Sequence, residues 1–242
     1  MNTIILAGGK GTRLQPYTTI FPKPLMPIGQ RPILDIIIQQ LAYYGFRDIF
    51  LSVGYLAELI QLYLENNSCR NYRVNISYIR ENTPLGTVGS LASIPSLDET
   101  FLVMNGDILT NLDYLDIVSY HRSKGAILTI GMYRKNINID LGVIETDADG
   151  ILTSYIEKPQ KQYSASMGIY VYEPDVLRYI EPGKYLDFPD LVSRLLQNGE
   201  KVVGYPFEGE WLDIGRHEDY VEAQKRYHKL QDTLLPISAL SR

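Results

Sequence analysis

Near its N-terminus the chain reads Leu6-Ala7-Gly8-Gly9-Lys10-Gly11-Thr12-Arg13-Leu14, directly after the apolar residues Ile4 and Ile5. Residues 3–7 predict a buried first strand. Three glycines within positions 8–11 let the following loop approach a ligand closely and turn its N–H groups toward phosphate oxygens. The stretch therefore predicts an anion-binding loop at the end of a strand, with a glycine-rich turn that binds nothing as the simpler alternative.

This loop departs from two familiar nucleotide-binding patterns. A Walker loop needs glycine and lysine followed by serine or threonine, and that triplet is absent. A dinucleotide fingerprint that begins at Gly9 and Gly11 needs a third glycine where Leu14 stands, and an acidic residue about 20 residues further on. Lys23-Pro24 occupies that region instead. The loop therefore argues against a nicotinamide oxidoreductase.

Outward from the loop, short β-rich runs alternate with segments of helical period. Strands are expected at 48–53, 73–79, 100–104, 126–133, 167–172, 201–205 and 210–213, and helices at 32–44, 56–64, 112–123, 188–197 and 217–231. This alternation predicts an α/β fold with a mainly parallel sheet. In the middle of the chain, 142–146 and 151–156 flank Asp149-Gly150, which predicts a β-hairpin. Because no linker or repeat separates these parts, we expect a single domain over residues 1–242.

Composition and charge narrow the function classes. The 242 residues carry 23 Lys and Arg against 28 Asp and Glu, a net charge of −5, which argues against a general nucleic-acid binder. No run approaches about 18 apolar residues, so no membrane span is expected. The single cysteine, Cys69, excludes an intrachain disulfide and suits a cytoplasmic location. The four charged residues before Asp35 are all basic (Lys10, Arg13, Lys23 and Arg31), which indicates an anion site around the glycine loop.

Four further motifs carry residues suited to phosphate chemistry. Pro22-Lys23-Pro24 restricts the backbone around a lysine and presents its charge at low entropic cost. Asn105-Gly106-Asp107 follows a predicted strand, so its carboxylate lies at the sheet edge where α/β folds bind ligands and suits Mg²⁺. Trp211-Leu212-Asp213-Ile214-Gly215 offers a second carboxylate. Glu157-Lys158-Pro159 offers a carboxylate for hydroxyl groups and a cation for another phosphate. Each motif alone is weak evidence, whereas their joint occurrence in this order is strong.

Together with the glycine loop, these motifs resemble the sugar-nucleotidyltransferase family, the nucleoside-diphosphate-sugar pyrophosphorylases. The resemblance runs from residue 3 to about residue 225. It implies a Rossmann-like three-layer α/β sandwich with a mixed central sheet and a β-rich extension on the sugar side. It also implies a nucleotide-binding part at about 1–130, a sugar-binding part at about 131–215 and a C-terminal helix at about 217–231. The implied reaction joins an NTP and a sugar 1-phosphate into NDP-sugar and pyrophosphate, with Mg²⁺ as cofactor.

The resemblance assigns a role to each site residue. Arg13 would stabilise the departing pyrophosphate, and Lys23 would hold the phosphates near the α-phosphorus. Asp107 and Asp213 would hold Mg²⁺. The nucleotide would contact Leu6, Ala7, Gly8, Gly9, Gly11, Thr12, Glu81, Gly86 and Thr87, and the sugar phosphate would contact Gly142, Glu157 and Lys158.

Glu81 bears on the choice of nucleotide, because it lies in the stretch that reads the base in relatives. A carboxylate only accepts hydrogen bonds, and guanine offers two adjacent donors, whereas uracil and thymine offer one donor between two carbonyl oxygens. With Pro84-Leu85-Gly86-Thr87, this favours GTP and resembles the branch acting on mannose or heptose 1-phosphate. A uridylyl- or thymidylyltransferase acting on a hexose 1-phosphate, and a nucleotide-sugar sensor without turnover, are the alternatives. Nucleic-acid and membrane partners are not expected, and a homo-oligomer is left open.

Overall fold

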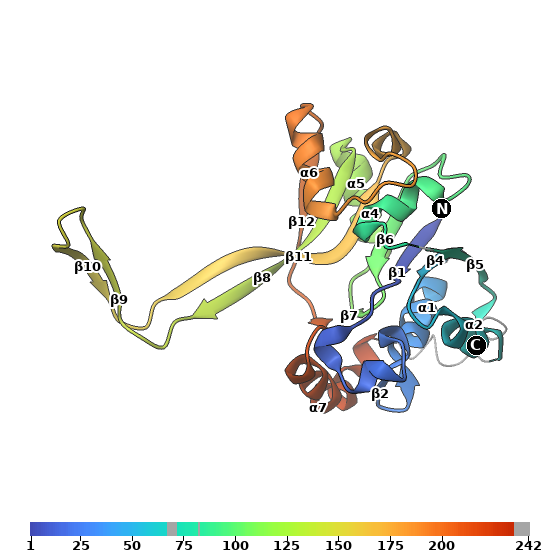
Figure 1. Cartoon of the computed structure of the whole chain (residues 1–242), viewed down its shortest axis with the longest axis horizontal. Coiled ribbons are helices and arrows are strands. Elements are labelled where there is room, and N and C mark those ends of the chain that lie inside the picture. Colours follow the sequence, from blue (N-terminus) through green and yellow to red (C-terminus); the bar gives the residue numbers. More distant parts are fainter. Residues whose placement is uncertain (67–71, 82, 235–242) are drawn as a thin grey trace.

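The centre of the computed structural model is a seven-stranded mixed sheet (Figure 1). The structure describes residues 1–66, 72–81 and 83–234, and Cys69 lies outside them. In spatial order the strands are β12 (Val202–Phe207), β8 (Leu128–Asn138), β11 (Gln160–Tyr172), β6 (Phe101–Asn105), β1 (Thr3–Ala7), β4 (Asp48–Val53) and β5 (Asn75–Arg80). From β6 to β5 all neighbours are parallel, and β11 runs antiparallel between β6 and β8.

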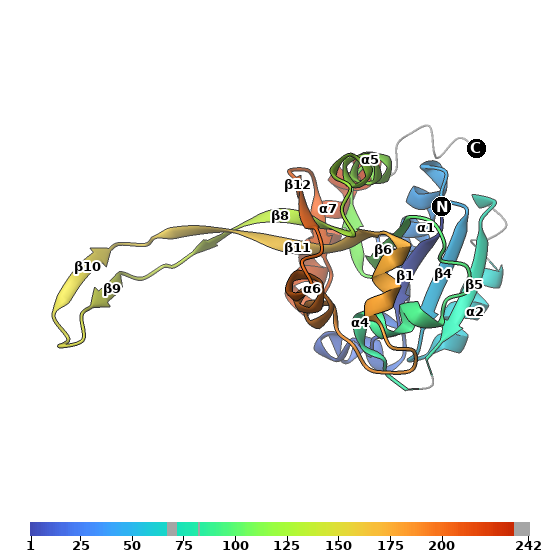
Figure 2. The same ribbon diagram turned by 90° about the horizontal axis from the view of Figure 1, so that it is seen from above.

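Helices cover both faces of this sheet (Figure 2). Neighbouring strand residues point to opposite faces, and Ile4 and Ile5 of β1 accordingly belong to two different buried clusters. The Ile5 cluster includes residues of α1 (Ile33–Tyr43), α2 (Ala57–Asn66), α5 (Tyr114–Lys124) and α7 (His217–Leu234). The Ile4 cluster includes residues of α4 (Gly86–Gly89) and α6 (Phe188–Gln197). The expected three-layer α/β sandwich with a mixed sheet is therefore confirmed.

Two short ladders lie beside the main sheet. β2 (Pro27–Ile28) pairs with β3 (Arg31–Pro32), and β7 (Ile108–Thr110) pairs antiparallel with β13 (Trp211–Asp213). In the second ladder Asp213 lies opposite Ile108, and the N–H of Ile214 donates to the carbonyl of Asp107 at 3.1 Å. A segment from the C-terminal part of the chain therefore returns to the carboxyl end of β6.

β8 and β11 continue beyond the sheet as a long two-stranded arm, which we define as residues 134–166 (Figures 1 and 2). The pairing of β8 with β12 ends at Tyr133, and within the arm β8 and β11 pair only with each other. Near the arm's end, β9 (Val143–Thr146) and β10 (Leu152–Ile156) form a second hairpin around the turn at Gly150. The expected β-rich extension is present, but it projects away from the body.

The sequence pattern predicts this hairpin correctly and misjudges the two long strands. β8 ends at Asn138 and β11 begins at Gln160, whereas residues 126–133 and 167–172 were the predicted limits. The additional residues are exposed on both faces of the arm, so they lack the apolar alternation that marks a half-buried strand. Among the described residues, none of the helices combines the length and apolar character that a membrane crossing requires.

Candidate active site

A cleft of about 490 Å³ opens at the carboxyl ends of the parallel strands. Loops that follow parallel strands meet at this edge, which is where open α/β sheets bind ligands. The cleft is lined by Leu6, Ala7, Gly8, Gly9, Gly11, Thr12, Arg13, Lys23, Pro24, Ser52, Glu81, Pro84, Gly86, Thr87, Asn105, Gly106, Asp107, Tyr185 and Asp187. Every residue that the sequence predicts as a nucleotide contact therefore lines a single cavity.

The glycines of the loop after β1 serve two different purposes. Gly11 has a φ of 62°, and a Cβ placed there would lie 2.9 Å from Cγ2 of Thr18, so the loop conformation itself requires glycine. The hydroxyl of Thr18 donates to the Gly11 carbonyl at 2.8 Å and fixes this turn. Gly9 is different, because a Cβ there would meet no atom within 4 Å. The missing side chain of Gly9 leaves open space in the cleft.

Opposite charges meet at the end of β6. Lys23 forms an ion pair with Oδ2 of Asp107, and the two side chains are only 12% and 20% exposed. Oδ1 of Asp107 is buried and has no hydrogen-bond partner among the described residues. Burial raises the pKa of Asp213, and the negative charge of Asp107 raises it further, whereas Lys23 and Arg13 oppose that change. The two carboxyls and the two cations therefore lie within electrostatic reach of one another.

This donor set fits Mg²⁺. The ion typically takes one or two carboxylates and completes its shell with phosphate oxygens and water. A divalent cation would satisfy the unpartnered oxygen of Asp107 and relieve the repulsion between Asp107 and Asp213. Within the described part of the chain, no cluster of three or more His, Cys, Asp or Glu side chains is arranged to hold a metal. Any metal here would therefore depend on two carboxylates together with the phosphates of a ligand.

The carboxylate of Glu81 is held in place at the end of β5. The hydroxyl of Ser52 donates to Oε1 at 2.5 Å, and the N–H of Leu85 donates to Oε2 at 3.1 Å. A carboxylate oxygen has two lone pairs, so each oxygen keeps one acceptor position. These two bonds fix the orientation of Glu81 and leave it able to accept from a ligand.

Another part of the cleft lining is built from two segments about a hundred residues apart in sequence. The N–H of Val88 donates to Leu186, and the N–H of Leu186 donates to Leu85. Asp187 accepts from the backbone N–H and the hydroxyl of Thr87 at 3.1 and 3.3 Å, and it also accepts from the hydroxyl of Tyr185. The bond from Tyr185 lowers the pKa of Asp187 and raises the pKa of Tyr185.

A protein-family model described as "Nucleotidyl transferase" matches residues 2–230 of the chain. The chain belongs to this family. A UTP–glucose-1-phosphate uridylyltransferase of Synechocystis sp. is 36% identical over 92% of this chain. A mannose-1-phosphate guanyltransferase of Schizosaccharomyces pombe is 33% identical over 91% of it. The chain spans 62% of the length of each of these two relatives.

Among solved structures of similar proteins is HddC from Yersinia pseudotuberculosis. It is 28% identical with a TM-score of 0.71, and the match covers 93% of this chain and 99% of that one. The same protein complexed with GMP-PN gives 26% identity and a TM-score of 0.70 over the same shares. The three-layer architecture is thus that of known nucleotidyl transferase structures.

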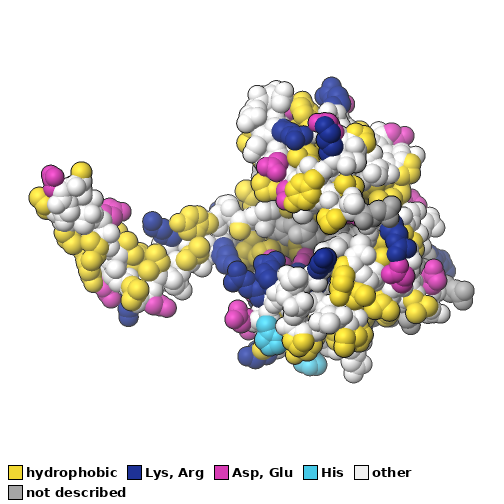
Figure 3. All heavy atoms as spheres, in the orientation of Figure 1, with side chains coloured by type: hydrophobic (Ala, Val, Ile, Leu, Met, Phe, Trp, Pro, Cys, Tyr) yellow, Lys and Arg dark blue, Asp and Glu magenta, His cyan; other side chains and the backbone are white. Residues whose placement is uncertain are grey.

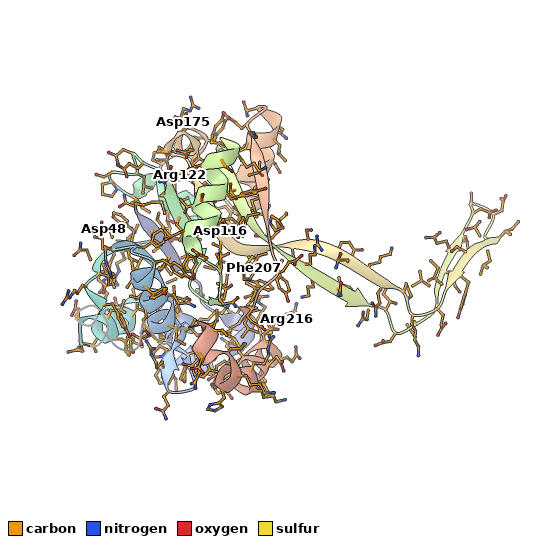
Figure 4. The ribbon with its side chains drawn as sticks, turned by 180° about the vertical axis from the view of Figure 1, so that it is seen from behind. Asp48, Asp116, Arg122, Asp175, Phe207 and Arg216 are labelled. Atoms are coloured by element: carbon orange, nitrogen blue, oxygen red, sulfur yellow. The ribbon has the colours of Figure 1, made fainter. Side chains whose placement is uncertain are left out.

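Three residues to which the resemblance gives a sugar-phosphate contact lie elsewhere in this nucleotidyl transferase. Gly142, Glu157 and Lys158 are on the arm, and none of them lines the cleft. Figure 4 shows the arm from behind, with its side chains extending on both sides and no other element beside it. The role of these residues stays a prediction.

Ser52, Tyr185 and Asp187 line the cleft and were missed by sequence reasoning. Ser52 lies one residue before the end of the strand predicted at 48–53, and nothing in that pattern marked its hydroxyl as a partner of Glu81. Asp187 precedes Pro189 at the start of α6, a position typical of a helix cap, yet its side chain caps Thr87 instead. Only the tertiary pairing of residues 85–88 with 185–187 reveals its place in the site.

Proposed function

We propose that this chain is a sugar-1-phosphate nucleotidyltransferase that joins an NTP, GTP by preference, to a sugar 1-phosphate and releases pyrophosphate. One observation carries the proposal. A glycine loop with open space at Gly9, the cations Arg13 and Lys23, and the carboxylate of Asp107 share one cleft at the carboxyl edge of a parallel sheet. This combination suits a nucleoside triphosphate, whose phosphates need N–H donors, cations and a metal.

In the proposed reaction an oxygen of the sugar phosphate forms a bond to the α-phosphorus of the NTP. The bond from that phosphorus to the oxygen bridging to the β-phosphorus breaks, and pyrophosphate departs with the electron pair. The attacking phosphate is already anionic at neutral pH, so no general base is required. Catalysis then consists of positioning two anions and neutralising the charge that develops on the leaving group.

The residues of the cleft divide this work. Backbone N–H groups of the glycine loop bind the triphosphate, Arg13 stabilises the departing pyrophosphate, and Lys23 holds phosphate oxygens near the α-phosphorus. Asp107 and Asp213 would hold Mg²⁺, which would supply a Lewis acid and an orienting template. Lys23 and Asp107 pair with each other in the structure, so both side chains are already positioned in the cleft. In the complex, phosphate oxygens would take the place of Asp107 beside Lys23, and the cation would take the place of Lys23 beside Asp107.

Glu81 supports GTP as the preferred nucleotide. Its two oxygens are oriented by Ser52 and Leu85, so one acceptor position on each is presented in a fixed geometry. Guanine offers two neighbouring donors to such a pair, whereas a pyrimidine base places carbonyl oxygens beside its single donor. The similar proteins do not decide between the nucleotides, because one is named for UTP and another for guanylyl transfer. A uridylyltransferase is therefore the second candidate.

The test is a matrix of substrates. The purified chain is incubated with Mg²⁺, each of the four common NTPs and dTTP, and a panel of hexose and heptose 1-phosphates, and pyrophosphate is measured. We expect release with GTP and at least one sugar phosphate. Release with UTP or dTTP alone would replace GTP by the second candidate. Binding of nucleotide sugar without release in any well would indicate a sensor and contradict the proposed activity.

A further inference from the structure

The cleft is incomplete for the two anionic substrates of the proposed reaction. Arg13 and Lys23 are the cations that line it among the described residues, and Lys23 is already paired with Asp107. A triphosphate alone carries more negative charge than these two side chains neutralise. A second cation for the sugar phosphate and an acceptor for sugar hydroxyls must therefore come from residues outside the lining.

The arm carries that chemistry. Glu157 and Lys158 are consecutive exposed residues, and the hydroxyl of Tyr155 donates to Oε2 of Glu157 at 2.7 Å. Lys158 has a φ of 46°, which lies in the left-handed region that is unfavourable for residues with a side chain. The surrounding loop holds it there through the bond from the Lys158 N–H to Leu141, and Ile139 bonds to Pro159 alongside. A cation and an oriented carboxylate are thus fixed together on the arm.

The arm cannot bring these residues to its own cleft in the observed fold. Six residue steps of about 3.3 Å each separate Ser166, at the root of the arm, from Gln160. Lys158 lies beyond Gln160, and therefore more than about 20 Å along the arm from its root. The arm leads away from the body in both views (Figures 1 and 2). Lys158 therefore lies far from the cleft of its own protomer.

The root of the arm is clamped, which argues against a hinge. The indole N–H of Trp211 donates to the carbonyl of Met167 at 3.0 Å, and the ring of Trp211 lies 5.2 Å from that of Tyr133. Gly168 forms part of a register shift in β11, and a Cβ on it would lie 2.5 Å from Nδ2 of Asn105. Asn105 itself lines the cleft. The direction of the arm is therefore set by packing against the edge of the site.

The surface of the arm is that of an interface. Of eighteen large hydrophobic side chains exposed among the described residues, eight lie in residues 134–166: Ile137, Leu141, Ile144, Ile151, Leu152, Tyr155, Ile156 and Tyr163. Figure 3 shows apolar side chains along the arm, and Lys and Arg side chains where the arm meets the body. A two-stranded ribbon is marginally stable by itself, and exposed apolar patches mark contact surfaces.

We propose that the arm of one copy docks on a second copy of this chain and places Glu157 and Lys158 at the partner's cleft, where they bind the sugar phosphate. The inference rests on the proposed function for its substrate. A second copy of this chain is favoured as the partner, because its cleft lacks the cation and the carboxylate that this arm carries. Twofold symmetry makes the exchange reciprocal, so that both clefts are completed at once and both arms are covered.

The first experiment is complementation between two impaired variants, assayed at a sugar 1-phosphate concentration below the KM of Lys158→Ala. Lys158→Ala keeps its own cleft and loses its arm contact, whereas Arg13→Ala keeps its arm and loses its cleft. The two are co-expressed with different affinity tags, and the mixed dimer is purified over both tags. One of its two sites then combines an intact cleft with an intact partner arm, so we expect about half of the wild-type rate. No recovery in a dimer whose parents are folded would overturn the proposal, as would a monomeric wild type in sedimentation.

Two further readouts separate binding from folding. Lys158→Ala should raise KM for the sugar 1-phosphate and leave KM for the NTP nearly unchanged, and the matched exposed variant Lys161→Ala should leave both unchanged. Equal increases in both KM values would contradict a contact confined to the sugar phosphate.

The second experiment does not depend on turnover, so it remains decisive if the proposed function fails. Unlabelled and ¹⁵N-labelled chains are refolded or co-purified together and treated with an amine-reactive cross-linker. Peptides joining Lys158 or Lys161 to Lys10 should occur as mixed-isotope pairs. If the cross-linked peptides contain single-isotope pairs and no mixed-isotope pairs, the arm folds back on its own protomer. That result would refute the exchange between copies. Absence of pyrophosphate release from the wild type, with mixed pairs present, would refute the function alone.

Discussion

Substitution of Gly9 by alanine should separate nucleotide binding from folding. A Cβ at Gly9 meets no atom within 4 Å, and its φ lies outside the left-handed region, so the protein can accommodate the methyl group. Gly-to-Ala changes of this kind restrict the unfolded chain and stabilise by about 0.4–1 kcal/mol. The unfolding free energy of Gly9→Ala should therefore equal or exceed that of the wild type.

Binding should respond in the opposite direction. In the proposed complex the triphosphate approaches the backbone at Gly9, and the methyl group would occupy that space. Loss of one hydrogen bond between a backbone N–H and a charged phosphate oxygen costs about 1.5–3 kcal/mol. At 1.4 kcal/mol for each factor of ten, the dissociation constant for NTP should rise at least about tenfold.

Gly11→Ala is the matched control. Its φ of 62° costs a residue with a side chain about 1–2 kcal/mol, and its Cβ would approach Thr18 to 2.9 Å. For a chain of this size, that loss lowers Tm by about 2–8 °C. Calorimetric melting and titration with a non-hydrolysable NTP should show Gly9→Ala stable but weak in binding, and Gly11→Ala unstable. Wild-type affinity in Gly9→Ala would refute the phosphate cradle.

Three other perturbations test the cleft and the body. Glu81→Gln keeps an acceptor for the N–H of Leu85 and loses the charge, so kcat/KM for GTP should fall about tenfold or more relative to that for UTP; an unchanged ratio in pyrophosphate assays would exclude base reading by Glu81. Arg13→Ala and Asp107→Ala should each lower kcat at least about 100-fold at saturating Mg²⁺, and near-normal turnover would make both residues structural. Burial lowers the pKa of His121, and Glu173 opposes this change. The imidazole therefore stays neutral in the folded state at pH values at which it takes up a proton in the unfolded state. Stability should therefore fall as pH drops through about 6.5, by at most about 1.4 kcal/mol per pH unit, and calorimetry of His121→Asn should show a flatter profile.

The nucleotide half of the site was predictable because short loops build it. Gly8 to Thr12 follow β1 directly, Glu81 follows β5, and Asp107 follows β6. In a parallel sheet these positions necessarily share one edge, so strand prediction alone brings them together. Tyr185 and Asp187 were not predictable in this way, since their contacts with residues 85–88 depend on how α6 packs. The local sequence pattern does not determine that packing.

The arm shows a second limit of sequence reasoning. The Asp149-Gly150 turn and the flanking apolar residues specify a hairpin locally, and the hairpin formed as expected. Its direction, however, depends on Trp211 bonding to Met167 and on Gly168 packing against Asn105, contacts that span more than forty residues. The residues of a motif can therefore be recognised correctly while the cleft they serve is not. If Lys158 acts on a partner's cleft, substitutions at the root of the arm should impair sugar-phosphate binding without changing any residue that touches the substrate.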